Sequence, residues 1–539
     1  MNTSNILKIT RPAYKECTMN EKLVDATSII TNKCFHTDIL NEDFTVRETK
    51  RDSFLIGGVL KLKNTYTFGF NEKGTELFEF QPINWRYPKF LVASNIKKDL
   101  LKNKEKVTDY FVIIKFKEWK YKLPTGTIEI KLGPIENDIN KYDILFYYYP
   151  TMPILKPKMI ELDYKEPTKI SVEGDVYSID PDGCIDIDDA ISYDFEKKRI
   201  GIHIADVAEI VKDYKFNRFS TVYAPHKNVP MFPEDISTNL ASLREGKIRN
   251  VITCWIYEPE TLTSESKGSI EVDSSEGDST DGDSTDANSI GGNSTDDESP
   301  CKLKVEFELN QIKVSKNLTY DEADALKISN PSLKILYEKS IKLGKDLNID
   351  VIDTHKMVEV YMILYNMFIT KKLEKEEGMI FRNQKGISKA VYNFKRESHS
   401  SLGLSFYSHA SSPIRRYVDY IIQGIFKGKP KEIVDLDKVN EYEKDIKRLS
   451  RMWDYLKASK EMKSGDEYEL EFREIQDNRL VFFCEKLNIT ISNKIGFNIL
   501  NGGMEINGCE YKLGEKYTRK LYLVDDKKNI LFYKILIQF

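Results

Sequence analysis

The chain has 539 residues, of which 40% are hydrophobic and 31% are charged. This length predicts several domains, and the composition excludes collagen-like, coiled-coil and wholly disordered proteins. No apolar stretch is long enough to cross a membrane, and the first residues lack the apolar segment of a signal peptide. We therefore expect no membrane association and a cytoplasmic location.

The charge is unevenly distributed along the chain. The formal net charge is −4, but residues 264–299 alone hold eleven acidic residues and one lysine, so the remainder is net basic. With 27 Phe, 30 Tyr and 4 Trp, such a body is compatible with binding of single-stranded nucleic acid. The seven cysteines form no CxxC pair, which argues against a zinc ribbon or a disulfide framework and favours reduced thiols.

The pattern of the chain predicts β-barrels on either side of a mixed centre. Residues 1–50 are weakly patterned and stay unassigned. Short β-type runs separated by turn residues predict a first, partial barrel at 51–90 and a second at 91–155. Residues 156–460 add three helical periodicities, so we expect the chemistry in this α+β segment. The β-type runs return at 465–539 and predict a C-terminal barrel.

Residues 264–299 are rich in Ser, Asp, Gly and Thr. Such a segment buries too little apolar surface to offset its ordering entropy, so we expect it to be disordered. The β-type runs at 251–258 and 302–309 flank it, which predicts an extended turn of one surface hairpin. A regulatory acidic segment is the alternative.

One loop concentrates carboxylates. Residues 178–190 read SIDPDGCIDIDDA, with acidic side chains at Asp180, Asp182, Asp186, Asp188 and Asp189. Oxygen-only ligands suit Mg²⁺ or Mn²⁺ better than zinc. A calcium EF-hand needs Gly and Glu where Ile185 and Ile191 stand. From this cluster alone, a solvated acidic turn is the competing interpretation.

Two further segments are similar in sequence to motifs of a known family. These are GIHIADVA at 201–208 and YSHASSPIRRYVD at 407–419. Together with the acidic loop, they resemble the ribonuclease II / ribonuclease R (RNB) family, and segments 223–233, 318–323 and 358–362 resemble its intervening blocks. The resemblance covers about 50–539. It implies a mixed α+β RNB core flanked by OB-fold barrels, two of them N-terminal and cold-shock-like and one C-terminal.

The resemblance also implies an activity and its cofactor. We expect a 3′-to-5′ exoribonuclease that hydrolyses single-stranded RNA to 5′-mononucleotides with two Mg²⁺ ions, Mn²⁺ being the alternative. The implied metal ligands are Asp180, Asp186, Asp188 and Asp189. Asp188 and Arg415 are the implied catalytic residues, since a guanidinium can hold a phosphate and stabilise transition-state charge. Asp182 lies outside the motif and is expected to be a turn residue.

The implied substrate-binding residues are Tyr223, Tyr320, Glu359 and Arg416. For the two tyrosines buried packing is the alternative, and for Arg416 it is a structural ion pair. We expect His203 and His409 to be structural. Gln423 and Gly424 replace the His-Arg that often follows the arginine motif, a change that concerns the frame more than the acidic loop.

Two rival functions stay open. One is a catalytically silent RNA-binding scaffold, which the four motif aspartates and Arg415 argue against. The other is a DNA nuclease, which only the resemblance disfavours. We expect a monomer. We expect no nuclease-type domain before the barrels, which makes an association with the exosome doubtful.

Overall fold

The computed structural model describes residues 5–53, 55–64, 66, 68–149, 162–212, 214, 216, 218–258, 303–386, 388–429, 434–476, 479–493, 498–500, 503–506, 509–524, 531 and 533–539. The chain forms two compact units. Unit 1 comprises 1–157, 216–229 and 437–539, and unit 2 comprises 158–215 and 230–436. Among the described helices, none is both long and apolar enough to span a bilayer.

Unit 1 begins with a small β module that has its own core. Its elements are β1 (Leu7–Arg11), β2 (Glu16–Met19), β3 (Lys22–Val24), α1 (Ala26–Thr31), β4 (Ile39–Leu40) and β5 (Val46–Glu48). The first three strands form one antiparallel sheet. Leu7, Ile9, Ile29 and Leu40 are buried together beneath it. The segment that the sequence left unassigned is therefore folded from residue 5 onward.

The next part of unit 1 is one closed barrel, in the order β10-β8-β7-β6-β9. Its elements are β6 (Leu55–Leu60), β7 (Leu77–Pro82), β8 (Phe90–Ala93), α2 (Ile96–Lys102), β9 (Tyr110–Glu118), β10 (Thr125–Pro134) and the following α3 (Asp138–Leu145). The prediction of two barrels, at 51–90 and 91–155, is wrong. Strand β6 pairs with β9 as well as with β7, so neither half has the strands to close alone.

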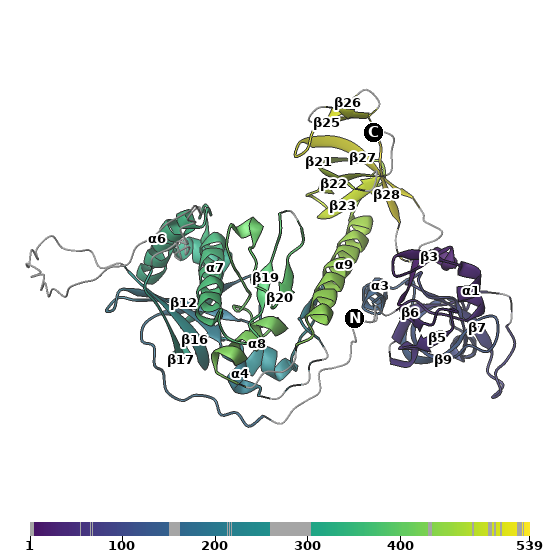
Figure 1. The fold of residues 1–539 in the computed structure, drawn as a ribbon, viewed down its shortest axis with the longest axis horizontal. Coiled ribbons are helices and arrows are strands. Elements are labelled where there is room, and N and C mark those ends of the chain that lie inside the picture. The colour runs from purple at the N-terminus through teal and green to yellow at the C-terminus, as the bar shows by residue number, and fades with distance from the viewer. Residues whose placement is uncertain are drawn as a thin grey trace, which may run out of the picture. The chain divides into compact units, whose positions relative to one another are not determined.

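The remainder of unit 1 comes from later in the chain. It contains the hairpin β14 (Val222–Ala224) and β15 (Lys227–Val229), the long helix α9 (Leu436–Glu461), and two C-terminal sheets (Figure 1). The sheets are β21 (Glu467–Gln476), β22 (Arg479–Cys484), β23 (Ile489–Asn493), β27 (Lys516–Val524) and β28 (Lys534–Ile537), and β24 (Asn498–Leu500), β25 (Gly503–Ile506) and β26 (Cys509–Tyr511). A buried cluster including Val59, Ile144, Val222 and Trp453 joins the barrel, α3, the hairpin and α9.

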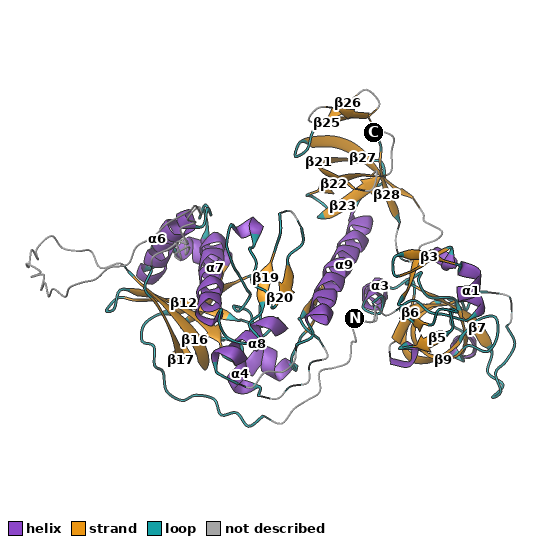
Figure 2. Ribbon diagram, in the orientation of Figure 1, coloured by secondary structure: helices purple, strands orange, loops and turns teal. Residues whose placement is uncertain are grey.

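Unit 2 is built on a six-stranded sheet in the order β17-β16-β13-β12-β11-β18. The strands are β11 (Val176–Asp180), β12 (Asp189–Asp194), β13 (Arg199–Ala205), β16 (Ile248–Tyr257), β17 (Val305–Lys313) and β18 (Lys316–Thr319). Every residue of β13 is buried, as its central place in the sheet requires. Figure 2 shows this sheet with helices packed on it.

The helices of unit 2 are α4 (Val207–Ile210), α5 (Tyr320–Leu326), α6 (Pro331–Asp346), α7 (Thr354–Leu373) and α8 (Tyr417–Phe426). A small hairpin, β19 (Phe381–Asn383) and β20 (Val391–Asn393), follows α7. At the start of α6 the Asn330 side chain caps the Leu333 N–H and Pro331 occupies the first turn, a combination typical of helix N-termini. Helices α6 and α7 lie side by side against the sheet (Figure 1).

Strands β16 and β17 pair antiparallel, with Ile256 opposite Val305. The acidic insert therefore connects two neighbouring strands, as the flanking runs predicted. The insert itself, 264–299, lies outside the described residues.

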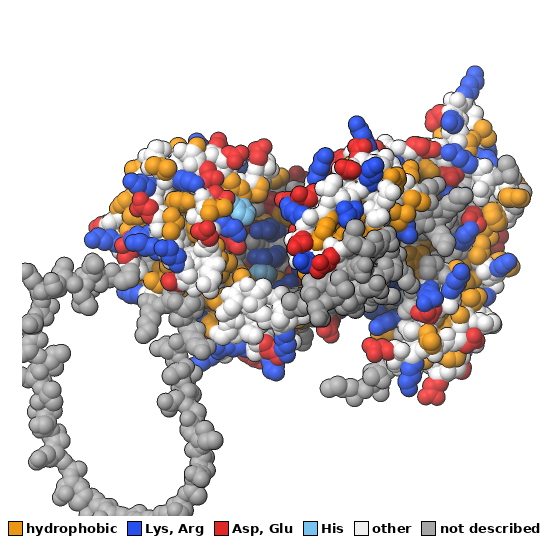
Figure 3. All heavy atoms as spheres, turned by 90° about the horizontal axis from the view of Figure 1, so that it is seen from above, with side chains coloured by type: hydrophobic (Ala, Val, Ile, Leu, Met, Phe, Trp, Pro, Cys, Tyr) orange, Lys and Arg blue, Asp and Glu red, His pale blue; other side chains and the backbone are white. Residues whose placement is uncertain are grey.

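In Figure 3, Lys and Arg side chains are interspersed with Asp and Glu on the visible face, so the charge of that face is mixed.

Candidate active site

The acidic loop is the connection between β11 and β12, two antiparallel neighbours. Asp180 is the last residue of β11 and Asp189 is the first residue of β12. The hairpin thus brings both carboxylates to one end of the sheet. On the other side of β11, Thr319 pairs with Asp180, so α5, which starts at Tyr320, begins beside the same carboxylate.

Asp188 and Arg415 form the ion pair at the centre of this site. The Ile414 N–H donates to Asp188 Oδ1 at 2.7 Å, and Arg415 Nε donates to Asp188 Oδ2 at 3.0 Å. The Asp188 side chain is 2% exposed, whereas that of Arg415 is 43% exposed. A buried carboxylate therefore holds a guanidinium that solvent can reach.

Burial raises the pKa of three aspartates in the loop. It raises the pKa of Asp180 to about 6 and that of Asp188 to about 7, although the positive charge of Arg415 acts in the opposite direction. The pKa of Asp189 lies well above its ordinary value, first because of burial and then because of the charges of Asp180 and Asp188. Ionisation of all three aspartates therefore requires more positive charge than Arg415 and Arg416 supply.

The donor set fits a hard divalent cation, because all its members are carboxylates. In addition, Asp180 Oδ2 is buried without a hydrogen-bond partner in the described part of the chain. Yet no three His, Cys, Asp or Glu side chains of that part are grouped as a ready metal site. Both Asp188 oxygens are engaged, and Asp186 Oδ1 faces the Cys184 thiol at 3.9 Å. The predicted Mg²⁺ site stays a prediction.

The sequence of unit 2 matches the RNB domain family over 171–389 and 385–428. These residues form an RNB domain. Residues 77–145, within the barrel and α3 of unit 1, match the Dis3-like cold-shock domain 2. This confirms the predicted fold class, an RNB core accompanied by OB-fold elements.

Relatives of this RNB chain include bacterial and eukaryotic nucleases. It is 25% identical to ribonuclease R of Mycoplasmopsis pulmonis over 86% of this chain and 77% of that protein. It is 27% identical to the human exosome complex exonuclease RRP44, over 37% of this chain and 22% of RRP44. The chain thus matches about a fifth of that larger protein.

Two solved structures share the fold of this RNB chain. Mycoplasma genitalium RNase R, in complex with ribose-methylated single-stranded RNA, has a TM-score of 0.69 at 16% identity and covers 99% of this chain and 100% of that one. Yeast Ssd1, described as a pseudonuclease, has a TM-score of 0.54 at 14% identity and covers 83% of this chain and 66% of that one. The RNB fold therefore occurs with and without nuclease activity.

The predicted substrate-binding residues of the RNB domain differ in their surroundings. The pKa of Tyr320 is raised to about 12, first by burial and then by the charges of Asp180 and Asp189, so its hydroxyl lies near the acidic loop. Its ring contacts His355 edge to face, with centroids 4.9 Å apart. Glu359 is one helical turn beyond His355 on α7 and therefore shares its face. It forms an ion pair with Lys356 at 2.7 Å.

Arg416 has an internal partner. Its Nη2 donates to Asp419 Oδ1 at 2.8 Å, and the Asp419 side chain is fully buried. The Ser412 N–H donates to the same oxygen at 2.7 Å. This arrangement favours the structural alternative over the predicted contact between Arg416 and RNA. No role was predicted for Asp419, although its spacing of three residues from Arg416 on a helix is a signal for such a pair.

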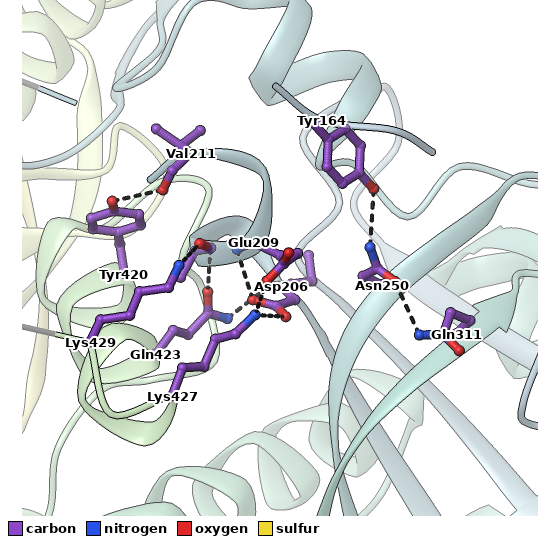
Figure 4. A network of polar contacts seen from close by, with 12 residues as sticks. Tyr164, Asp206, Glu209, Val211, Asn250, Gln311, Tyr420, Gln423, Lys427 and Lys429 are labelled. Carbon is purple, nitrogen blue, oxygen red and sulfur yellow. Dashed lines mark hydrogen bonds and ion pairs between the residues drawn. The ribbon is translucent and has the colours of Figure 1, made fainter. Parts of the chain in front are cut away.

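A polar network joins α8 to the segment after β13 (Figure 4). Gln423 Nε2 donates to the Ala205 carbonyl at 2.7 Å, and Gln423 Oε1 accepts from the Ala208 N–H at 3.3 Å. Lys427 bonds Asp206 at 2.6 Å and Glu209 at 2.5 Å. Since β13 pairs with β12 and α8 begins two residues after Arg415, the network fixes the arginine segment relative to the acidic loop. Gln423, which replaces a residue that is often His in the family, is thus part of the structural frame around the acidic loop.

The remaining predicted residues are two histidines with internal polar partners and one tyrosine of unit 1. His203 is buried between Ser192 Oγ at 2.8 Å and Thr253 Oγ1 at 2.9 Å, as expected of a structural histidine. His409 Nδ1 is 2.7 Å from the Tyr392 hydroxyl. Tyr223 belongs to unit 1, on strand β14, and its side chain is 46% exposed.

Proposed function

We propose that this chain is a metal-dependent 3′-to-5′ exoribonuclease that hydrolyses single-stranded RNA to 5′-mononucleotides. The polarity and the product rest on the RNB domain and on the likeness to ribonuclease R. The proposal includes Mg²⁺, with Mn²⁺ as the alternative, and a monomer in the cytoplasm.

The observation that carries the proposal is the pair of Asp188 and Arg415. A structural ion pair in a protein interior is normally enclosed, because exposure weakens it. Here the carboxylate is buried while 43% of the arginine side chain is exposed, at the edge of a loop with four more aspartates. This arrangement suits a guanidinium that contacts an external phosphate.

Each residue then has a distinct task. Asp180, Asp186 and Asp189 would hold the cation, whose chemistry is to activate water and to neutralise charge on the phosphoryl oxygens. Asp188 orients Arg415 through the hydrogen bond from Nε. Arg415 then stabilises negative charge that develops on the scissile phosphate. Tyr320, beside Asp180, would contact the 3′-terminal nucleotide.

A silent RNA-binding scaffold is the second candidate, because the pseudonuclease Ssd1 shares the fold. A scaffold has no need of buried aspartates with raised pKa values, since these carboxylates repel each other and cost stability. This chain retains Asp180, Asp186, Asp188 and Asp189 together with Arg415. We therefore favour the enzyme.

The test uses purified full-length protein and 5′-labelled single-stranded RNA. With Mg²⁺ we expect progressive shortening of the labelled strand and release of 5′-mononucleotides, and with EDTA we expect none. Internal cleavage products would contradict the exonuclease, and binding without any hydrolysis in Mg²⁺ or Mn²⁺ would establish the scaffold. A 5′-labelled DNA of the same sequence tests the DNA nuclease, and we expect slower cleavage of it.

A further inference from the structure

The part of the acidic loop that contains Asp186 is held by a segment remote in the sequence. Residues 181–188 lie between β11 and β12 and belong to neither strand, so sheet pairing does not fix them. We call residues 242–245, which precede β16, the bracing segment, because they form hydrogen bonds with this loop. Both the loop and the bracing segment belong to unit 2.

The Ser242 hydroxyl bonds the backbone on both sides of Asp186. It donates to the Ile185 carbonyl at 2.9 Å and accepts from the Ile187 N–H at 3.2 Å. The next residue of the bracing segment adds a bond from the Leu243 N–H to the Ile187 carbonyl at 3.1 Å. Ser242 is fully buried and Ile187 is 4% exposed, so loss of the hydroxyl costs a buried N–H its partner.

Arg249 and Asn317 anchor the bracing segment to the sheet. Arg249, on β16, is 1% exposed, and its Nε donates to the Ser242 carbonyl at 3.1 Å. Asn317, on β18, donates through Nδ2 to the Leu243 carbonyl at 3.0 Å and accepts at Oδ1 from the Glu245 N–H at 2.7 Å. The Ser242 hydroxyl therefore acts from a segment that two strands hold in place.

Asn317 also connects the bracing segment to the start of the acidic loop. Its Nδ2 donates a second hydrogen to Ser178 Oγ at 2.7 Å, and the Ser178 hydroxyl bonds the Asp180 carboxylate. Ser178 is 1% exposed. One amide thus supports Asp180 through Ser178 and Asp186 through the bracing segment.

These two carboxylates need such support because their charges oppose each other. Asp186 lies close enough to Asp180 for the two charges to interact, and repulsion between ionised carboxylates favours a loop that opens. Buried hydrogen bonds to the backbone of the loop resist that opening. A cation then finds its ligands already in place, so that little ordering of the loop is required on binding.

We propose that Ser242 is a positioning residue for Asp186, supported by Asn317, and that it sets the acidic loop for a divalent cation before the cation binds. This inference rests on the proposed function, because the cation is part of that function. A purely structural Ser242 would affect the stability of the protein and leave its affinity for cations unchanged. The affinity for a cation therefore separates the two roles.

The experiment measures cation affinity in the absence of RNA. Mn²⁺ is titrated into the full-length protein, and the EPR signal of the free ion gives the dissociation constant. Loss of a group that orients metal ligands commonly weakens metal binding by about 10–100-fold, and we expect a loss in this range for Ser242→Ala. Ser242→Thr retains the hydroxyl and should recover most of the affinity.

Asn317→Leu is a second variant, which keeps the Ser242 hydroxyl and removes the amide at similar volume. We expect its dissociation constant for Mn²⁺ to rise about tenfold. Thermal melting in EDTA shows which variants are folded. If Ser242→Ala does not fold, Asn317→Leu decides, and an affinity equal to that of the wild type overturns the inference.

Ser340→Ala is the matched control. Ser340 is fully buried on α6, and its hydroxyl donates to the Tyr337 carbonyl of the same helix at 2.7 Å. We expect this variant to bind Mn²⁺ as the wild type does, whatever its melting temperature. If Ser242→Ala binds Mn²⁺ equally well, or Ser340→Ala loses as much affinity, this inference is overturned while the proposed function stands. If the wild type binds no Mn²⁺, the proposed metal dependence fails as well.

Discussion

Asp188 and Arg415 are 227 positions apart in the sequence, and Arg415 Nε lies 3.0 Å from Asp188 Oδ2. The Ile414 N–H holds the other carboxylate oxygen. The acidic loop therefore fixes both the backbone and the side chain of the arginine segment. This relationship makes the guanidinium a preorganised group, and its loss should affect the reaction more than the binding of RNA.

Arg415→Lys is the first test. Lysine keeps the positive charge but lacks the planar fork, so RNA affinity should change little while the single-turnover rate at saturating RNA falls by about 10²–10³-fold. Rapid-quench measurement of that rate in Mg²⁺ checks the prediction. Arg416→Lys, which alters the buried pair with Asp419, serves as the comparison and should lower the melting temperature more than Arg415→Lys does. A rate within about threefold of wild type would exclude Arg415 from catalysis.

Asp189→Asn should abolish cleavage and leave RNA affinity nearly intact, because RNA binding is spread over a large surface whereas cation binding is local. The same substitution removes a buried charge that repels Asp180 and Asp188. The free energy of unfolding in EDTA should therefore stay the same or rise. Denaturant titration and a gel-based cleavage assay give both values. A large loss of stability in EDTA would indicate that the acidic loop is only structural.

The stability of the metal-free protein should depend on pH through Asp180 and Asp188. Their pKa values of about 6 and about 7 in the folded state lie above the ordinary 3.8. The folded state therefore binds more protons than the unfolded state in this window, and their stabilising contribution is lost as pH rises from about 4 to 7. The slope is at most about 1.4 kcal/mol per pH unit for each group.

His203 works in the opposite direction, since burial lowers its pKa from 6.5 to about 3. Its contribution is present above pH 6.5 and is lost as pH falls. Comparing wild type with Asp188→Asn at each pH in EDTA removes this common background. The wild type should lose more stability than the variant as pH rises, and equal pH profiles would contradict the shifted pKa of Asp188. Saturating Mg²⁺ should reduce the difference.

Lys427→Met should destabilise the protein by about 3–5 kcal/mol, the usual cost of leaving a buried carboxylate unpaired. The carboxylate concerned is Asp206, which is 3% exposed and 2.6 Å from Lys427. Urea unfolding measures the loss. Lys385→Met removes an ion pair with Glu397 in which the lysine is 76% exposed, and should leave the stability nearly unchanged. Similar effects of both substitutions on the free energy of unfolding would show that the α8 network contributes no more to stability than an exposed ion pair does.

The sequence was sufficient for the local features of this protein. The alternation of apolar residues located the strands, helical periodicity located α6, α7 and α9, and the spacing of aspartates marked the acidic loop, because these patterns depend only on neighbours in the chain. The motif around 407–419 predicted Arg415 as the catalytic arginine, and this stays a prediction. It left Arg416 open, since adjacent side chains have different environments only once a fold exists.

Only the tertiary structure decided what depends on distant contacts. The pairing of β6 with β9 replaced two predicted barrels by one, because barrel closure joins strands about 50 residues apart. Burial at the end of the sheet raised the pKa values of the aspartates, an effect that no local pattern contains. Likewise, Ser242 contacts the acidic loop because a segment more than 50 residues away folds against it.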